Sequence, residues 1–322
     1  MNAPRLCIVV PCYNEEETLP RSLDILLEAL TRLHGKRKTA ENSYICCIDD
    51  GSRDGTWALI EQRSSENRQV KGIKLSANFG HQNALIAGLF TEYPHADCLI
   101  SIDADLQDDV DAVERMMDAF GKGFRVVYGV RSIRTADSRS KRWLAEGFYA
   151  VMKKMNPKSI TNHADFRLAG SEVIRHLERF GEVNLYLRSI FPLIGFPSTC
   201  VYYERKQRLT GKTKYPIRKQ MSFAWQGITS FSTVPLKMIF RLGIFTTVIS
   251  LALCIWVLWA ALSGHVIKGW ASTVIPILFF SGIIILSLGI IGEYVGKIYQ
   301  EVKNRPRFII ETQTEENLTF PR

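Results

Sequence analysis

Acidic side chains gather in the segment CLISIDADLQDD, residues 98–109, where an apolar run ends. Alternate residues of an extended segment point the same way, so Asp103, Asp105 and Gln107 can bring two carboxylates and an amide oxygen together. Oxygen ligands of this kind suit a hard cation, which would offset the charge of a diphosphate. Three further aspartates are interpreted instead as turn formers or helix caps: Asp54, Asp108 and Asp109.

These side chains follow the fourth of five short aliphatic runs that alternate with helical patterns. The expected strands are residues 6–10, 44–48, 70–75, 99–102 and 124–128. The expected helices between them are residues 18–33, 56–63, 82–93 and 110–120. This alternation predicts an α/β fold with a mostly parallel sheet and helices on both faces. Ligands of such sheets bind at the carboxyl ends of the strands. The polar segments found there form the candidate site: 11–17, 49–55, 76–80 and 103–109.

Two common nucleotide-binding signatures are missing from the sequence. No G-x-G-x-x-G occurs, and the GKT of residues 211–213 lacks the glycine that a P-loop needs at the position of Lys206. A P-loop ATPase and a dinucleotide dehydrogenase are therefore excluded. The seven cysteines contain no C-x-x-C pair, which favours reduced structural thiols.

Two long runs without a charged side chain follow residue 241. Residues 243–262 and 274–292 each have about the length that crosses a hydrocarbon core, and we predict two transmembrane helices. A pair of buried core helices is the alternative, but it would leave no polar face for water. Lysines and arginines lie on the outer flanks of the two runs, so both termini are expected in the cytoplasm. The apolar stretch 6–10 is too short for a signal peptide.

Four motifs occur in order at the expected strand ends: VVPCYNEEETLP, CIDDGSRDGT, NFGHQNALIAGL and SIDADLQDD. With them the chain resembles family 2 inverting glycosyltransferases, which have the nucleotide-sugar-binding GT-A fold. Later segments are similar to those of polyprenyl-phosphate glycosyltransferases, in particular the bactoprenol glucosyltransferases of O-antigen modification clusters. These segments are ADFRLAG, YYERKQRLTGKTKYPIRKQ, SFSTVPLKMI and GIIGEYVGKIYQEVKNRPRFII.

The resemblance implies a donor site for a UDP-sugar. Its nucleotide-sugar-binding residues would be Pro11, Tyr13, Asn14, Glu15, Asp50, Ser76, Asn78 and Asp103. Asp103, Asp105 and Gln107 would be the metal ligands, holding Mg2+ or Mn2+ against the diphosphate. The helix that contains Asn83 would brace this pocket, and His81 is interpreted as a cap or packing residue.

The resemblance also implies an acceptor site for undecaprenyl phosphate. Its lipid-phosphate-binding residues would be Arg131, Arg134, Ser138 and Arg139, of which Arg131 is preferred. Arg205 would hold the diphosphate under a flap, while the lysines that follow it would adhere to anionic lipid headgroups. Asp165, in the acceptor-loop segment 164–168, would orient the acceptor or the sugar. The predicted catalytic set is Asp103, Asp105, Asp165, Arg131 and Arg205.

A lipid phosphate is already anionic, so the reaction needs positioning and neutralisation of two phosphate groups rather than a strong general base. In-line attack opposite UDP would invert the anomeric centre. UDP-glucose would then give β-glucosyl-phosphoryl-undecaprenol for the modification of O-antigen or another cell-envelope glycan. The alternatives are the same reaction with UDP-N-acetylglucosamine or another UDP-sugar, and a non-catalytic membrane scaffold.

Two other classes are disfavoured. The net charge of +9 could suit nucleic acid, but much of the positive charge clusters near the apolar runs rather than among stacking aromatics. A processive polysaccharide synthase would need more than two spans for a pore, and no Q-x-x-R-W motif occurs.

The sequence thus predicts four regions. They are a cytoplasmic GT-A domain (1–215), an amphipathic juxtamembrane helix (216–235), a two-helix transmembrane hairpin (236–298) and a cytoplasmic C-terminal tail (299–322). The juxtamembrane helix would keep the catalytic domain beside a lipid substrate whose phosphate stays at the bilayer surface. We expect a multi-pass protein of the bacterial inner membrane that forms a homo-oligomer, with a tetramer as one form.

Overall fold

A computed structural model describes residues 3–132, 163–182, 187–204, 234–263 and 270–314. The chain divides into two compact units, Met1–Lys214 with Pro306–Arg322, and Tyr215–Arg305. Several predicted features lie outside the described residues: Arg134, Ser138, Arg139, Arg205 and residues 216–233 of the juxtamembrane helix.

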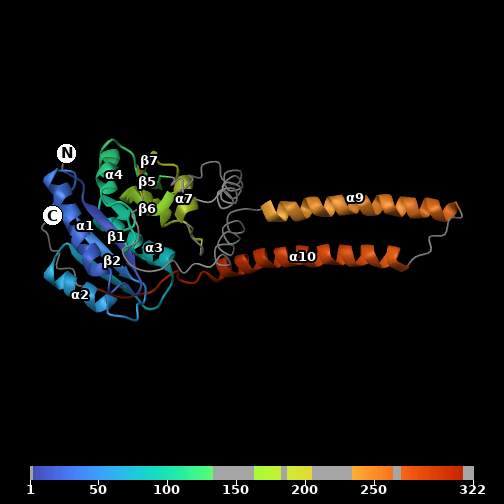
Figure 1. The fold of residues 1–322 in the computed structure, drawn as a ribbon, viewed down its shortest axis with the longest axis horizontal. Coiled ribbons are helices and arrows are strands. Elements are labelled where there is room, and N and C mark those ends of the chain that lie inside the picture. Colours follow the sequence, from blue (N-terminus) through green and yellow to red (C-terminus); the bar gives the residue numbers. More distant parts are fainter. Residues whose placement is uncertain (1–2, 133–162, 183–186, 205–233, 264–269, 315–322) are drawn as a thin grey trace. The chain divides into compact units, whose positions relative to one another are not determined.

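The first unit is built around an eight-stranded sheet in the order β7-β5-β6-β4-β1-β2-β3-β8. Figure 1 labels β1, β2, β5, β6 and β7 of this sheet, with helices packed around them. The strands are β1 (Leu6–Cys12), β2 (Tyr44–Asp49), β3 (Val70–Leu75), β4 (Cys98–Ser101), β5 (Val126–Arg131), β6 (His163–Gly170), β7 (Ser198–Tyr203) and β8 (Ile310–Gln313). Neighbours from β4 to β3 run parallel, as do β5 and β7, whereas β6 and β8 are antiparallel to theirs. The predicted mostly parallel sheet is confirmed.

Helices cover both faces of this sheet. They are α1 (Leu19–Gly35), α2 (Thr56–Glu66), α3 (His81–Glu92), α4 (Ala112–Gly121), α6 (Ser171–Leu177) and α7 (Leu187–Ile194), with a short 3-10 helix, η1 (Tyr93–His95). Ile8 and Val10 of β1 belong to the core that α1 and α4 close on one face. Val9 points to the other face, where α3 packs against it. Central parallel strands are buried on both sides, which is why β1 and β2 are apolar almost throughout.

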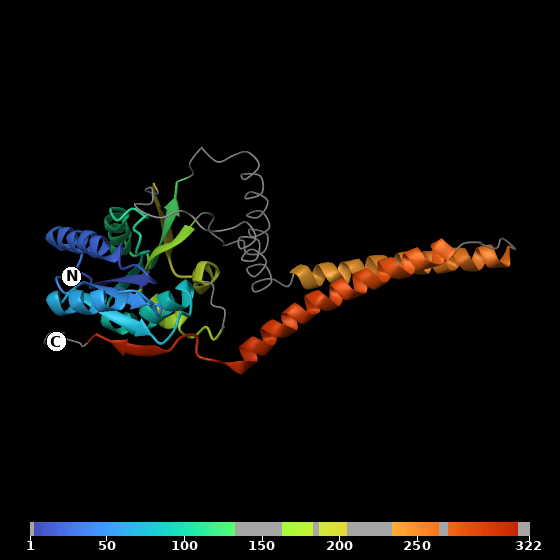
Figure 2. The same ribbon diagram turned by 60° about the horizontal axis from the view of Figure 1, so that its bottom comes forward.

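The strand β8 was not expected, because it belongs to the predicted C-terminal tail. It pairs with the edge of β3, with Lys74 opposite Thr312. Hydrogen bonds extend the pairing at both ends: Ser76 N donates to Ile309 O at 2.9 Å, and Gly72 N donates to the Thr314 hydroxyl at 2.9 Å. Figure 2 shows β8 in red along one edge of the sheet. The tail therefore completes the first unit and covers an edge that would otherwise be open.

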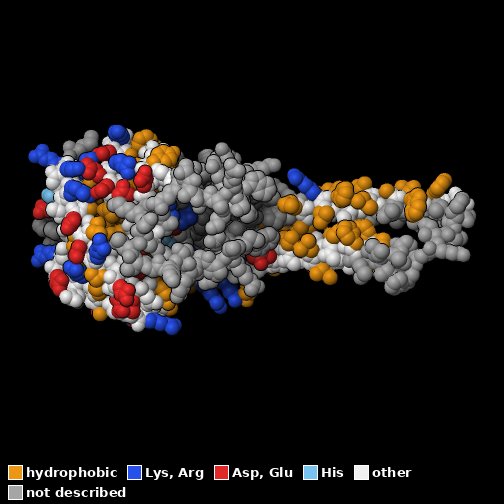
Figure 3. Space-filling model, in the orientation of Figure 1, with side chains coloured by type: hydrophobic (Ala, Val, Ile, Leu, Met, Phe, Trp, Pro, Cys, Tyr) orange, Lys and Arg blue, Asp and Glu red, His pale blue; other side chains and the backbone are white. Residues whose placement is uncertain are grey.

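The second unit holds two long helices, α9 (Val234–Leu262) and α10 (Trp270–Lys303). Figure 3 shows apolar side chains along both helices, whereas charged side chains of both signs are mixed over the first unit. Among the described residues one helical segment, Phe279–Lys303, has the length and hydropathy to cross a membrane. The predicted second span, residues 243–262, lies within α9 and stays a prediction.

Close packing of α3 on the sheet depends on Gly88. A Cβ atom at this position would lie 2.5 Å from Val9 Cγ1 and 2.8 Å from Ile48 Cδ1, both in central strands. We expect Gly88→Ala to lower the free energy of unfolding by about 1–3 kcal/mol, because the core must shift to admit the methyl group. Chemical denaturation of the purified chain, followed by intrinsic fluorescence, measures this.

The matched control is Gly121→Ala at the end of α4, where a Cβ atom meets nothing within 4 Å. This variant should be as stable as the parent or more stable, since alanine favours the helical state. Equal stability of the two variants would contradict the described packing of α3.

Candidate functional site

The predicted polar segments meet at one edge of the sheet. β1, β2, β3 and β4 are parallel, so their carboxyl ends lie on the same side. β1 lies between β2 and β4. The chain adds β2 and β3 on one side of β1 and then adds β4 on the other side. Such a switch in strand order opens a crevice at the carboxyl ends, where ligands of α/β sheets bind.

The loop after β1 is fastened to the loop after β2. Asn14, with a left-handed φ of 54°, donates its backbone N–H to the Ser52 hydroxyl at 2.9 Å. Its side-chain oxygen accepts from the backbone N–H of Arg53 at 2.9 Å. The backbone N–H of Glu15 donates to the Thr56 hydroxyl at 2.9 Å. Asn14 and Glu15, predicted to contact the nucleotide, thus shape the loop that presents Tyr13.

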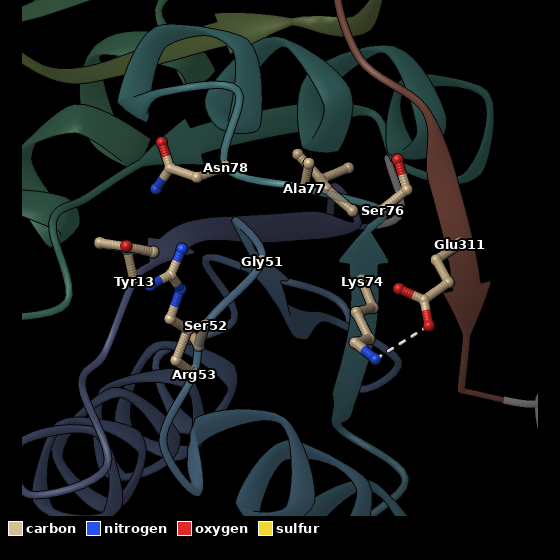
Figure 4. A pocket seen from close by; sticks show the side chains of 10 residues that line it. Tyr13, Gly51, Ser52, Arg53, Lys74, Ser76, Ala77, Asn78 and Glu311 are labelled. Carbon is tan, nitrogen blue, oxygen red and sulfur yellow. Dashed lines mark hydrogen bonds and ion pairs between the residues drawn. The ribbon is translucent and has the colours of Figure 1, made fainter.

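A cavity of about 370 Å3 opens beside these loops (Figure 4). Its lining residues are Tyr13, Gly51, Ser52, Arg53, Lys74, Leu75, Ser76, Ala77, Asn78 and Glu311. Three of the predicted nucleotide-sugar-binding residues belong to this lining: Tyr13, Ser76 and Asn78. The other five do not: Pro11, Asn14, Glu15, Asp50 and Asp103. Tyr13 is 43% exposed, so its ring can stack on a ligand.

Asp50 shapes the turn that begins α3. Its carboxylate is buried and accepts from the backbone N–H of Phe79 at 2.7 Å and of Gly80 at 2.9 Å. Gly80 has a left-handed φ of 89°, which the missing side chain permits. Asn83 braces the same turn by donating its side-chain N–H to Phe79 O at 2.9 Å. Burial raises the pKa of Asp50, and the two N–H donors oppose that rise.

The acidic segment after β4 is a turn rather than an extended strand. The backbone N–H of Leu106 donates to Asp103 O at 3.1 Å, and Leu106 has a left-handed φ of 43°. The premise of alternating side chains is therefore wrong, because the chain reverses within the motif. Gln107 donates its side-chain N–H to Asp105 Oδ2 at 2.5 Å and so fixes that carboxylate. Coordination of a metal by these residues stays a prediction.

Asp103 lies among other charges. Burial raises its pKa, and the carboxylates of Asp108, Asp165 and Asp105 raise it further, whereas His81 lowers it. His81 is the first residue of α3, with Nε2 3.5 Å from Asp103 Oδ1 and 3.9 Å from Asp165 Oδ2. The interpretation of His81 as only a cap or packing residue misses this position between two carboxylates.

The side chains around Asp103 fit a divalent cation whose other ligands are water molecules and substrate phosphates. Within the described part of the chain, no group of three or more His, Cys, Asp or Glu side chains could hold a metal. Mg2+ commonly uses one or two protein carboxylates and completes its shell with water and substrate phosphates. Asp103 suits that arrangement, because its side chain is 41% exposed and neighbouring carboxylates disfavour further negative charge.

Asp108 is a buried ion-pair partner, so its interpretation as a turn former or helix cap is wrong. The helix α4 begins only at Ala112, with Asp111 at its N-cap, which leaves Asp108 in the preceding loop. Its side chain is 2% exposed and accepts from Arg131 Nη2 at 3.0 Å and from the Tyr203 hydroxyl at 2.7 Å. Burial beside this carboxylate raises the pKa of Tyr203, which keeps the hydroxyl protonated as a donor.

The other two aspartates are turn formers, as predicted. Asp54 Oδ1 accepts from the backbone N–H of Thr56 at 3.1 Å and from its hydroxyl at 2.6 Å. Asp109 Oδ1 accepts from the backbone N–H of Asp111 at 3.4 Å. Both stabilise local chain geometry at the edge of the site.

Asp165 of β6 lies between two arginines. Arg167 Nη2 donates to Oδ1 at 2.9 Å, and Arg188 donates from Nε to Oδ1 at 3.1 Å and from Nη2 to Oδ2 at 2.8 Å. Gln82 adds its side-chain N–H at 3.2 Å. Burial alone would raise the pKa of Asp165, but Arg188 and Arg167 outweigh it and hold the pKa well below the usual range. A carboxylate this firmly deprotonated suits an orienting role better than that of a proton acceptor.

Sequence reasoning missed Arg188, Gln82, Lys74 and Glu311. Arg188 extends from α7 and is 39% exposed, and its segment carried no recognisable motif. Gln82 follows His81 in the segment that is predicted to brace the donor pocket, and no direct role is predicted for its side chain. Lys74 is the penultimate residue of β3, a position that could have placed it at the predicted edge.

Comparison with known proteins extends over nearly the whole chain. The model of Glycosyl transferase family 2 matches residues 7–177. An uncharacterized glycosyltransferase of Bacillus subtilis (strain 168), YkoT, is 47% identical over 308 residues, covering 96% of this chain and 91% of the relative. The SfII prophage-derived bactoprenol glucosyl transferase of Shigella flexneri is 35% identical over 309 residues, covering 95% and 97%.

A solved structure is also similar to this chain. The mannosyltransferase PcManGT from Pyrobaculum calidifontis, in complex with GDP-Man and Mn2+, has a TM-score of 0.49 at 14% sequence identity. The similarity covers 94% of this chain and 86% of that one.

Replacing Asp165 tests the charge balance at β6. Asp165→Asn removes a buried carboxylate that pairs with Arg167, whose side chain is 2% exposed, and we expect a loss of about 3 kcal/mol in unfolding free energy. Denaturation midpoints of the two proteins measure the loss. The control is Asp118→Asn, which removes an exposed ion pair with Lys38 and should cost under about 1 kcal/mol. If Asp165→Asn had the same denaturation midpoint as the parent, the ion pairs of Asp165 with Arg167 and Arg188 would not contribute to stability.

A double-mutant cycle tests the pair formed by Asp108 and Arg131. Arg131→Ala should destabilise the chain by about 2–3 kcal/mol, because the buried Asp108 loses its positively charged partner and retains the hydrogen bond from Tyr203. Adding Asp108→Asn should restore part of that stability, since the uncompensated charge is removed. Thermal unfolding of the parent, both single variants and the double variant gives the coupling energy. Strictly additive effects would show that the two side chains do not depend on each other.

Proposed function

Because the chain belongs to glycosyltransferase family 2, we propose that it transfers glucose from UDP-glucose to undecaprenyl phosphate with inversion. The product would be β-glucosyl-phosphoryl-undecaprenol. Relatives that match nearly the full chain and are named bactoprenol glucosyl transferases support a polyprenyl-phosphate acceptor and a glucosyl donor. The observation that carries the proposal is one edge of an α/β sheet of the GT-A type that bears both a cavity at Tyr13 and an acidic turn at Asp103.

The cavity suits the nucleoside of the donor. The Tyr13 ring offers a stacking surface for a base, while Ser76 and Asn78 offer polar groups. Glu15 and Asp50 would act indirectly, since one fixes the loop of Tyr13 and the other fixes the turn at Phe79. Pro11 is buried at the end of β1 and would support the same wall.

The acidic turn suits the diphosphate. Asp103 and Asp105 would hold Mg2+ or Mn2+, with Gln107 keeping Asp105 in position and Arg205 reaching the diphosphate from the later basic segment. A divalent cation bound there would neutralise the charge that develops on the departing diphosphate. The excess of carboxylates around Asp103 supports this assignment, because they favour a positive group.

The acceptor phosphate would meet Arg131. Its guanidinium is fixed by Asp108 and Tyr203, and about a third of the side chain is exposed (32%), so it is oriented before a ligand arrives. Preorganised donors of this kind stabilise charge without further rearrangement. Arg134, Ser138 and Arg139 would complete the phosphate-binding group.

In the proposed reaction an oxygen of the lipid phosphate attacks C1 of glucose on the face opposite UDP. The new C1–O bond forms as the bond from C1 to the UDP oxygen breaks, and UDP leaves with that electron pair. No proton needs to be removed from an anionic phosphate. Asp165 would therefore act by orienting: it holds Arg188, whose exposed portion can contact an anionic or hydroxyl group of the substrates.

The membrane segment fits a lipid acceptor. Large apolar side chains of α10 are exposed, among them Phe279, Ile285 and Val302. An apolar surface of this size is stable in lipid but costly in water. We propose that α9 and α10 anchor the enzyme in the cytoplasmic membrane, with the catalytic unit in the cytoplasm.

The proposal is tested with purified enzyme, labelled undecaprenyl phosphate and a panel of UDP-sugars. We expect a glucosylated lipid from UDP-glucose and none without a divalent cation. Preferred transfer from UDP-N-acetylglucosamine would change the sugar but keep the reaction class. No transfer from any member of the panel would favour the membrane scaffold.

Substitution of the acidic turn tests the mechanism. Asp103→Asn and Asp105→Asn should each lower the rate of transfer by about 100-fold or more, because the charge that holds the cation is lost. Thermal unfolding of Asp103→Asn should change little, since this side chain is 41% exposed and lies among other carboxylates. Asp109→Asn, in the same segment, is the control and should keep most of the activity. Parental rates in both Asp103→Asn and Asp105→Asn would refute the mechanism.

A further inference from the structure

One wall of the cavity comes from the far end of the chain. Glu311 lies on β8, and its Oε1 is 3.0 Å from Lys74 Nζ on the neighbouring strand β3. In Figure 4, Tyr13, Arg53 and Asn78 lie on one side of Gly51. The ion pair of Lys74 and Glu311 lies on the other side. Both members of the pair keep accessible surface, with side chains that are 26% and 47% exposed for Lys74 and Glu311.

The strand order tells which part of a nucleotide would reach this pair. Asp103 follows β4, whereas Glu311 lies on β8, four positions away across β1, β2 and β3. Strands in a sheet are about 4.8 Å apart, so the two carboxylates are separated by roughly 19 Å in that direction. A donor whose diphosphate is near Asp103 would therefore point its nucleoside towards Glu311.

Charge supports the same orientation. A carboxylate at the β8 end of the cavity repels phosphate but accepts hydrogen bonds from N–H and hydroxyl groups. The ammonium of Lys74 beside it can donate to a carbonyl oxygen. Uracil presents a ring N–H flanked by two carbonyl oxygens, and this pattern complements an adjacent carboxylate and ammonium.

We propose that Glu311 and Lys74 form a recognition pair for the nucleoside of the donor. Glu311 accepts a hydrogen bond from the nucleoside, and Lys74 both holds Glu311 in place and donates to a neighbouring oxygen. The inference rests on the proposed binding of a UDP-sugar at this cavity. It adds a specificity determinant that is supplied by the segment after α10, which residues 304–309 connect to β8.

The test is calorimetric titration of the full-length protein with UDP, with pyrophosphate as a probe of the metal-binding end, both in the presence of Mn2+. Glu311→Ala should bind UDP about tenfold more weakly, because a charge-assisted hydrogen bond is lost. The affinity of Glu311→Ala for pyrophosphate should equal that of the parent protein. Thr312→Ala, the adjacent position on β8 outside the cavity lining, should bind both ligands as the parent does.

Unchanged binding of UDP by Glu311→Ala would overturn the inference and leave the proposed function intact. An equal loss of UDP and pyrophosphate would overturn it too, because it would indicate a general disturbance of the fold. If the parent itself fails to bind UDP, the proposed function fails first.

Titration with 2′-deoxy-UDP separates the two sources of the hydrogen bond. A tenfold effect of Glu311→Ala that persists with this ligand assigns the contact to the base. An effect that disappears assigns it to the ribose hydroxyl.

Discussion

The buried ion pairs beside β4 determine what the rest of the site can do. Asp165 is matched by Arg167 and Arg188, and Asp108 is matched by Arg131. Each of these carboxylates is below one tenth exposed and already has a fixed cation. Asp103 differs, since its side chain is 41% exposed and its ion-pair partner among the described residues is the His81 ring, with Nε2 at 3.5 Å. This difference supports the proposal that a divalent cation binds at Asp103, whereas Asp108 and Asp165 are already paired with arginines.

In the proposed reaction, this division would let one small region bind two anionic substrates. Ion pairs orient Arg131 and Arg188, so that the exposed portion of each guanidinium has a defined direction. The acidic turn would instead hold an exchangeable cation, which could arrive and leave with the nucleotide. The proposed transfer would take place between the guanidinium of Arg131, which is fixed, and a divalent cation at Asp103, which can be exchanged.

Local patterns predicted the alternating strands and helices as far as β5, but they did not predict β6, β7 and β8 or the tertiary contacts. Strands such as residues 6–10 were predictable because burial on both faces of the sheet selects a continuous aliphatic run. The turn at Leu106 was missed because a left-handed residue other than glycine leaves no clear mark in sequence. The partners of Asp165 and the approach of Glu311 to Lys74 are tertiary contacts, the latter spanning 237 positions, and no spacing rule encodes them. The residues predicted from the family resemblance have two kinds of place in the structure. Some line the cavity, as Tyr13 does, and others hold the neighbouring loops together, as Asn14 does.

The pairing of β8 with β3 also constrains how the chain can thread through a bilayer. Two strands of one sheet must be on the same side of a membrane, so the polypeptide between them has to cross an even number of times. If α10 crosses once, as proposed, a second passage in the opposite direction has to occur between β3 and α10. The uncharged residues 243–262 of α9 have the length for that passage. A hydrogen-bonded strand at the sheet edge thus fixes the parity of the membrane topology.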